Sequence, residues 1–232
     1  MKKKLLPVVM FLATTCYSQG FDKAFMKADT KHNLNYELLR AVATHESGMN
    51  PLSIGFVIKT DALAAAVDAD LKSANVKHKK RPYKKWYHYS LFFASAQDAA
   101  KAIPWLEKAT EASTGYDIGV MQVNSRNATR NGWSVERLLS EPEYNIDCAA
   151  GILAGCRDSF KWDPAKTLEC YNKGTRVAIF DYQYYGAVFS KFKKGGGVEA
   201  VVQNQNKPLP RRRQVVNDQV MPQEFQGERT LF

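Results

Sequence analysis

Glu46 is a carboxylic acid in an electrostatically unfavourable position. Leu38, Val42 and Glu46 follow one another at steps of four residues, so a helix over this segment places all three on one apolar face. Asn35 is of the type that caps a helix N-terminus and Gly48 of the type that ends a helix, which puts Glu46 in the last turn. Desolvation and the negative end of the helix dipole both favour the protonated carboxyl, the form that a general acid needs near neutral pH.

Other catalytic chemistries lack a recognisable pattern in the sequence. The chain contains 4 His residues, and none has the spacing of metal ligands. There is no suggestion of a Ser-His-Asp or Cys-His arrangement and no phosphate-binding glycine loop. We therefore expect no metal and no cofactor.

The N-terminal residues have the organisation of a secretory signal. Three lysines at positions 2–4 precede an apolar run over residues 5–15 and then small and polar residues, which predicts a signal peptide at 1–20 with cleavage near Ser18 or Gly20. This run is too short for a transmembrane helix and no later run is long enough, so we expect no transmembrane segment in the mature chain. We expect an exported protein of the periplasm or cell envelope; the alternative is an uncleaved anchor.

Export makes a disulfide bond possible among the later cysteines. Two helical patterns, at about 143–160 and 164–172, are joined by a short turn, and in such an antiparallel hairpin Cys156 and Cys170 lie at matching heights. Cys148 lies two further turns away, roughly 12 Å along the axis at ~1.5 Å per residue. We predict a Cys156–Cys170 bond with Cys148 unpaired and buried; the alternative is three unpaired cysteines.

The chain is strongly basic, with a formal net charge of +10. Basic residues cluster at 77–85, 191–194 and 211–213, and the first cluster interleaves cations with aromatic residues, a composition that also suits nucleic acid. For an exported protein, an anionic cell-wall polymer is the better candidate. A solvated loop without a partner is favoured over both, and no nucleic acid is expected as a partner.

The patterning predicts an α+β, mostly α-helical chain of 232 residues, long enough for one sizeable core. A strand is expected at 53–58 and a second β-like run at 86–93, and Ser95 with Asp98 forms a capping box for a helix that Pro104 kinks or restarts. Residues 115–125 are rich in turns. Helices are expected at about 21–29, 35–47, 61–73, 143–160, 164–172 and 176–192. The glycines at 195–197 end a domain at 21–194, and a flexible polar and basic tail follows at 195–232.

Four segments occur in order: ESGMNP at 46–51, YDIGVMQVN at 116–124, CYNKG at 170–174 and YYGAV at 184–188. Together they resemble the soluble lytic transglycosylases, whose lysozyme-like domain cleaves the glycan of peptidoglycan. That family has a Glu-Ser helix end, a Gly-Leu-Met-Gln turn, an Ala-Tyr-Asn-x-Gly helix end and a late Tyr-Val-x-x-Val helix. The resemblance covers about 22–192, and four motifs in order are more specific than any one of them. It implies a lysozyme-like domain with a small β-containing insertion.

The chain departs from this pattern at three positions. Val120 stands in place of Leu, Cys170 in place of Ala, and Tyr185 in place of the Val that follows the late Tyr. The first two are apolar exchanges that can preserve packing. The long stretch between Glu46 and the turn at residues 119–122, here called the glycine turn, resembles the specialised branch that serves conjugation and secretion machines. This resemblance implies machinery proteins as further partners.

The resemblance implies that Glu46 is the sole catalytic acid and base. Standard glycoside hydrolysis uses two carboxylates, and Asp117 is the nearest candidate for a second one. In the family a single Glu protonates the glycosidic oxygen and then deprotonates the C6 hydroxyl of N-acetylmuramic acid (MurNAc), giving a 1,6-anhydro product without water. The alternatives are a hydrolytic muramidase on the same fold and a non-catalytic peptidoglycan-binding assembly factor.

The resemblance also implies a set of residues that bind peptidoglycan glycan strands. The Gln122 amide can both donate to and accept from a sugar, and Gly119 would let the backbone approach the glycan closely. Tyr184 would orient Glu46 or contact sugar through its hydroxyl. The whole set is Ser47, Gly119, Met121, Gln122, Tyr171, Asn172 and Tyr184.

Overall fold

The computed structural model describes residues 20–111, 113–174 and 179–195. Residues 1–19 of the predicted signal peptide at 1–20 and residues 196–232 of the predicted tail at 195–232 lie outside these ranges, so the predicted domain boundaries stay predictions. Within the described ranges, no helix is both long enough and apolar enough to cross a membrane.

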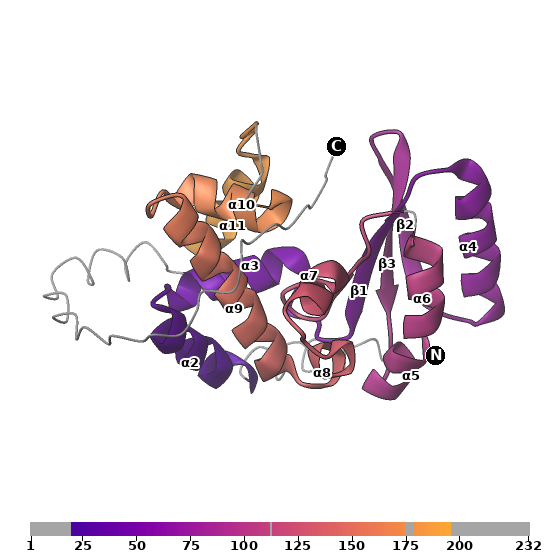
Figure 1. Cartoon of the computed structure of the whole chain (residues 1–232), viewed down its shortest axis with the longest axis horizontal. Helices are drawn as coiled ribbons and strands as arrows, with labels where there is room; N and C mark the ends of the chain where they lie inside the picture. The colour runs from indigo at the N-terminus through magenta and orange to yellow at the C-terminus, as the bar shows by residue number, and fades with distance from the viewer. Residues whose placement is uncertain (1–19, 112, 175–178, 196–232) are drawn as a thin grey trace, which may run out of the picture.

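A helical lobe contains both ends of the described chain. Its helices α3 and α11, α9 and α10, and α2 and α9 pack in contacting pairs, as Figure 1 shows on the side away from the sheet. The members of this lobe are α2 (Asp22–His32), α3 (Tyr36–Glu46), α9 (Pro142–Ser159), α10 (Pro164–Lys173) and α11 (Gln183–Lys194). The mostly helical α+β class expected from the sequence is confirmed.

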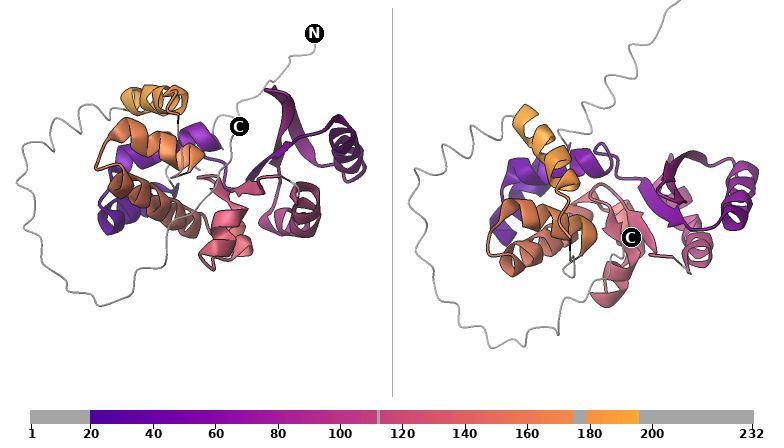
Figure 2. Two further views of the ribbon diagram at one scale, coloured as in Figure 1. Left: turned by 45° about the horizontal axis from the view of Figure 1, so that its top comes forward. Right: turned by 90° about the horizontal axis from the view of Figure 1, so that it is seen from above.

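The second lobe is built on a five-stranded antiparallel sheet in the order β2-β3-β1-β4-β5. Its strands are β1 (Ser53–Ile58), β2 (Lys77–Tyr83), β3 (Trp86–Phe92), β4 (Tyr116–Ile118) and β5 (Val123–Asn124). The helices of this part of the chain are α4 (Asp61–Ser73), α5 (Ala96–Lys101), α6 (Ile103–Thr110), α7 (Ser125–Arg130) and α8 (Val135–Ser140). Figures 1 and 2 show α4 and α6 on one side of the sheet and the helical lobe on the other.

The central strand β1 joins the sheet to its helices. Every residue of β1 is buried. The Phe56 ring stacks on Tyr89 of β3 at 5.2 Å and meets Trp105 of α6 edge-on at 5.9 Å. The Tyr89 hydroxyl donates to Asp68 of α4 at 2.8 Å, so one sheet face is fixed to both helices. Rigid packing of this kind holds the ends of β1 and β4 in place beside the helical lobe.

The interpretation of residues 77–85 as a solvated loop is wrong. Lys77–Tyr83 is strand β2, paired along its whole length with β3, and the turn at Lys84 has a φ of 55°. The alternation of side chains makes this possible, because Lys80 points toward α4 and forms an ion pair with Asp68 at 2.7 Å. A strand can therefore be highly basic when its cations divide between two faces.

Other boundaries also differ from the expectations. The turn-rich segment 115–125 contains the two short strands β4 and β5. Two helices that the sequence did not predict come next: α7, which begins at Ser125, and α8. The last helix begins at Gln183 instead of near residue 176, because Tyr182 has a left-handed conformation, with φ at 56°, that a helix cannot continue. Residues 175–178 lie outside the described ranges.

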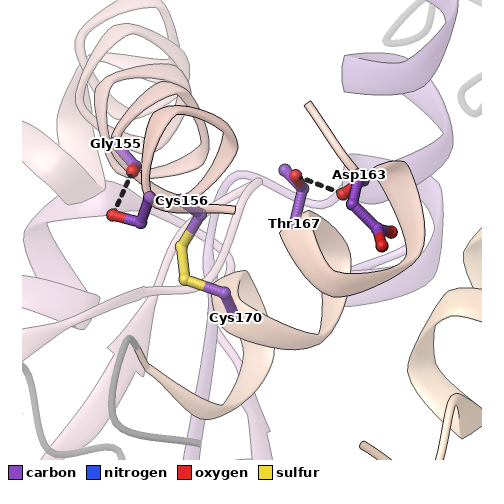
Figure 3. Close-up of a disulfide and its surroundings, with 6 residues drawn as sticks. Gly155, Cys156, Asp163, Thr167 and Cys170 are labelled. Carbon is purple, nitrogen blue, oxygen red and sulfur yellow. Dashed lines mark hydrogen bonds between the residues drawn. A yellow bond between two sulfur atoms is a disulfide. The ribbon is translucent and has the colours of Figure 1, made fainter. Parts of the chain in front are cut away.

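The helix hairpin α9–α10 is joined by the disulfide bond Cys156–Cys170, the pairing favoured from the sequence, with Cα atoms 5.7 Å apart (Figure 3). Cys148 is unpaired and buried, also as expected. Asp163 caps α10 by accepting from the amides of two residues in its first turn. The bond lies directly before the Tyr-Asn-Lys-Gly end of α10, which it therefore anchors to α9.

Candidate active site

Glu46 ends α3 with its carboxyl half-buried and directed at α11. Asn35 caps the start of this helix by accepting from the Leu38 amide at 2.9 Å, as expected. The Tyr184 hydroxyl of α11 donates to Glu46 Oε1 at 2.5 Å. The His45 ring meets the Tyr184 ring edge-on at 5.0 Å. Burial, with a smaller contribution from Lys191, lowers the pKa of His45, so a neutral ring supports the tyrosine.

Ser47 joins the end of α3 to the turn that follows β4. Its hydroxyl donates to the Val120 carbonyl at 2.8 Å and accepts from the Asn50 amide at 3.0 Å. Gly48 has a φ of 64°, the left-handed conformation that ends a helix in the way its sequence predicts. Ser47 thus fixes Glu46 relative to the glycine turn, and a sugar contact for Ser47 stays a prediction.

The glycine turn is held from two other directions through Met121. The Met121 amide donates to Asn145 Oδ1 at 2.9 Å, and its carbonyl accepts from the Tyr171 hydroxyl at 2.7 Å. The Met121 side chain is fully buried and packs in the core. The second of these contacts connects the turn to the end of α10, so Tyr171 has a structural partner here in addition to its predicted role in binding.

Asn145 is a residue of this site that the sequence motifs did not indicate. It is fully buried in α9, and its amide nitrogen donates to the carbonyls of Ile118 at 2.8 Å and Leu138 at 3.1 Å. With its bond to Met121, one side chain serves three backbone groups around the turn. A polar residue on the buried face of a predicted helix was the available signal.

Position 119 must be a glycine because Asn145 packs directly against its backbone. Its φ is 77°, and a Cβ there would lie 2.4 Å from Asn145 Nδ2 and 2.8 Å from the Leu138 carbonyl oxygen. The close approach expected at this glycine thus involves protein atoms; an approach by glycan stays a prediction.

Replacing Gly119 by alanine is expected to lower the free energy of unfolding by about 3 kcal/mol, from the strained φ and from overpacking against Asn145. The matched control is Gly132→Ala, because Gly132 has a φ of 64° and open space where a Cβ would go. It should cost about 1 kcal/mol, the strain alone. Urea unfolding measures both, and equal losses would contradict the close contact.

Gln122 lies where the turn meets the sheet. It is buried with a φ of 52°, and its amide nitrogen donates to the carbonyls of Ser53 at 3.1 Å and Gly119 at 2.8 Å. Its Oε1 faces β1, because a Cβ on Gly55 would lie 2.8 Å from it and 3.5 Å from His88 Nε2. The bonds to Ser53 and Gly119 fix the amide so that its nitrogen is committed to the protein.

The end of α10 carries a buried ion pair that was also missed. Glu169 is fully buried; one oxygen accepts from the Tyr185 amide at 3.0 Å and the other lies 2.8 Å from Lys173 Nζ. Burial acts to lower the pKa of Lys173, but its hydrogen bonds to Asp181 and Glu169 outweigh this and raise it. This pair ties α10 to the start of α11 and so positions Tyr184.

The structure therefore joins most of the predicted site residues in one network of contacts: Glu46, Ser47, Gly119, Met121, Gln122, Tyr171 and Tyr184. Asn172 follows Tyr171 at the end of α10 and is half-buried. Asp117 lies on β4 instead, with Oδ1 accepting from Asn124 at 2.9 Å. Among the described residues, no three His, Cys, Asp or Glu side chains are grouped as metal ligands would be.

Residues 23–188 match the family model of the transglycosylase SLT domain. No curated protein and no solved structure matches the chain. The match covers more than half of the sequence and includes every predicted site residue, from Glu46 to Tyr184. The chain therefore belongs to the transglycosylase SLT family of lysozyme-like lytic transglycosylases, enzymes that act on peptidoglycan.

Proposed function

We propose that the protein cleaves the β-1,4 bond between MurNAc and N-acetylglucosamine (GlcNAc), with Glu46 as sole acid and base. The observation that carries this is the half-buried Glu46 carboxyl held by the Tyr184 hydroxyl at 2.5 Å. A carboxyl shielded from water at the end of a rigid helix is suited to exchanging a proton with a bound substrate. Because the family forms its product without water, one carboxyl is sufficient.

In the proposed reaction the Glu46 carboxyl takes part in two proton transfers. Glu46 donates its proton to the glycosidic oxygen as the bond to C1 of MurNAc breaks, and GlcNAc leaves with a free hydroxyl. The 2-acetamido group of MurNAc stabilises the positive charge at C1. The Glu46 carboxylate then takes the proton of the C6 hydroxyl, whose oxygen bonds to C1 and closes the 1,6-anhydro ring. Glu46 ends protonated, ready for the next cycle.

The surrounding residues have positioning and binding roles in this proposal. Tyr184 orients the Glu46 carboxyl, and Ser47 fixes the helix end to the glycine turn through the Val120 carbonyl. Gln122 accepts from a sugar hydroxyl or acetamido N–H group through Oε1, and Asn172 contacts sugar hydroxyl and acetamido groups. The support for these roles is their place in, or beside, the network that contains Glu46.

Analysis of the products tests the proposal. We expect peptidoglycan digested by the full chain to yield muropeptides that end in 1,6-anhydroMurNAc, identified by mass spectrometry. The reason is that an internal hydroxyl, not water, attacks C1. A digest in which the new ends are reducing MurNAc would contradict transglycosylation and establish the hydrolytic alternative.

The cellular setting is a further part of the proposal. We infer export through a signal at residues 1–20, a catalytic domain at 21–194 and a polar tail at 195–232. Between Glu46 and the glycine turn the chain inserts β1 to β3 and α4 to α6. This long insertion supports membership of the branch that opens the wall locally for a secretion or conjugation machine.

A further inference from the structure

We propose that the open side of strands β2 and β3 binds the carboxylates of peptidoglycan stem peptides while the glycan lies at Glu46. This inference rests on the proposed function, because it adds a second contact for the same polymer. It concerns three cations of β2, here called the basic face: Lys77, Lys79 and Arg81.

The direction of the basic face follows from the alternation of side chains. Lys80 of β2 and Tyr89 of β3 both reach Asp68 of α4, so these positions point toward the covering helices. Lys79 and Arg81 directly flank Lys80 on the strand, so their side chains point to the opposite face of the sheet. Figures 1 and 2 show that this is the side of the sheet on which the helical lobe lies. Lys79 and Arg81 are exposed there.

A row of contacts leads from the basic face to the candidate active site. Arg81 is paired with His88 in the sheet, and its guanidinium lies 3.4 Å from His88 Nδ1. His88 Nε2 and Gln122 Oε1 both lie next to Gly55, on the side where a Cβ of that residue would be. Gln122 belongs to the turn whose Val120 carbonyl accepts from Ser47, next to Glu46. A polymer bound at Gln122 is therefore within a few side chains of Arg81.

The tip of the hairpin is influenced by charges from the other end of the site. Burial raises the pKa of Tyr83, and the charges of Lys173 and Asp181 also act on it, the first lowering and the second raising that pKa. Lys173 is at the end of α10, two residues after Tyr171. The hairpin tip is therefore within electrostatic range of the end of α10 and of the segment before α11.

The charge of the hairpin is unbalanced on the basic face. Strands β2 and β3 contain no Asp or Glu. Lys80 is neutralised on the helix side by Asp68, whereas Lys79 lies over the Phe92 ring at 5.8 Å and Arg81 adjoins the His88 ring. Burial and then Arg81 lower the pKa of His88, against the opposing charge of Asp117. Within the described part of the chain, Lys79 and Arg81 therefore lie beside aromatic rings and form no ion pair.

Stem peptides fit this chemistry better than the glycan itself does. The sugar chain carries no charge, but each MurNAc bears, through its lactyl group, a peptide with free carboxylates. Guanidinium and ammonium groups bind carboxylates through charge-assisted hydrogen bonds. Since peptides branch from the glycan at every second sugar, a strand lying at Glu46 places a carboxylate-bearing branch beside it.

Binding measured on two forms of one ligand tests the inference. The full chain carries Glu46→Gln so that the ligand stays intact. Its ligands are soluble glycan strands with their peptides, and the same strands after an amidase has removed the peptides. We expect the peptide-bearing strands to bind about tenfold more tightly, the combined effect of two surface ion pairs. The double substitution Lys79→Gln/Arg81→Gln should remove that preference.

The matched control is Lys72→Gln/Lys108→Gln, which removes the same charge from α4 and α6, on the covered side. It should keep the preference, and thermal melting checks that both variants fold. Equal affinity for the two ligands, or a preference that survives Lys79→Gln/Arg81→Gln, overturns the inference. The inference is also overturned if duplex DNA binds more tightly than the peptide-bearing strands and with a steep salt dependence, because that result would identify a phosphate-binding site. Because no cleavage is needed, this result is independent of the anhydro-product analysis.

Discussion

Replacing Glu46 by glutamine is expected to lower turnover on peptidoglycan by about a thousandfold, the size of a general acid–base contribution. An amide of the same shape can still accept the Tyr184 hydroxyl now found 2.5 Å from Oε1, so the local structure should persist. It can neither release a proton to the glycosidic oxygen nor take one from the C6 hydroxyl. Both steps of the proposed reaction are therefore blocked by one substitution.

Release of anhydro-muropeptides over time, quantified by mass spectrometry, measures this effect. The control is Glu37→Gln, which removes a carboxylate from the first turn of the same helix α3. Turnover by this variant should stay within about twofold of the wild type, because the half-buried Glu37 carboxylate lies at the opposite end of α3 from Glu46 and its ion pair with Arg40 is long, at 4.0 Å. Binding of Glu46→Gln to intact peptidoglycan should be retained.

Two outcomes would redirect the assignment. Appreciable residual turnover by Glu46→Gln with reducing ends would indicate a second carboxylate, for which Asp117 on β4 is the candidate. Full complementation of a deletion strain by Glu46→Gln would favour the non-catalytic assembly factor.

The helix that presents Glu46 could be predicted because its signals are local. Asn35, the apolar steps to Val42 and the glycine at 48 specify the start, the buried face and the end of α3 within fourteen residues. The pairing of Cys156 with Cys170 is local in the same sense, since both cysteines lie in one helical hairpin. Such features depend on backbone geometry that is regular over short distances.

The hairpin β2–β3 could not be predicted, because its outer strand depends on partners distant in the sequence. Polar, basic residues such as those of Lys77–Tyr83 have little tendency to form strands by themselves. The strand is stabilised by the full register with β3 and by the ion pair between Lys80 and Asp68 of α4. Charge patterning alone therefore gave a loop.

Buried polar residues that hold the site together are equally hidden in the sequence. Asn145 and Glu169 each lie inside a helix whose apolar pattern continues around them. Their importance appears only when their partners are known: the glycine turn for Asn145, and Lys173 with the Tyr185 amide for Glu169. Motifs identify residues that touch substrate more readily than residues that brace them.

Replacing Tyr184 by phenylalanine is expected to lower kcat by about tenfold to a hundredfold, the range for loss of one hydrogen bond to a charged group. The ring itself would stay, packed edge-on against His45. Without the hydroxyl, the Glu46 carboxyl loses the donor that fixes its orientation toward the glycosidic oxygen. KM should change little, since in this proposal Tyr184 orients the catalytic group and does not bind sugar.

The pH profile distinguishes this role from a merely structural one. A hydroxyl that donates to a carboxylate stabilises its charged form, so removing that donor raises the pKa of Glu46 in the variant above its pKa in the wild type. The first step needs protonated Glu46, and activity is lost as pH rises through that pKa. The alkaline limb of kcat/KM should therefore move to higher pH in Tyr184→Phe.

The matched control is Tyr185→Phe, which loses the same hydroxyl one position along α11, where the ring stacks on Phe189 at 5.3 Å. Its kcat should stay within about twofold of the wild type, as for a substitution outside the site. The alkaline limb of its kcat/KM profile should not shift. A lower kcat for Tyr184→Phe with an unmoved limb would mean that the hydroxyl does not act through Glu46. A raised KM with unchanged kcat would instead identify Tyr184 as a sugar contact, the other role that its motif implies.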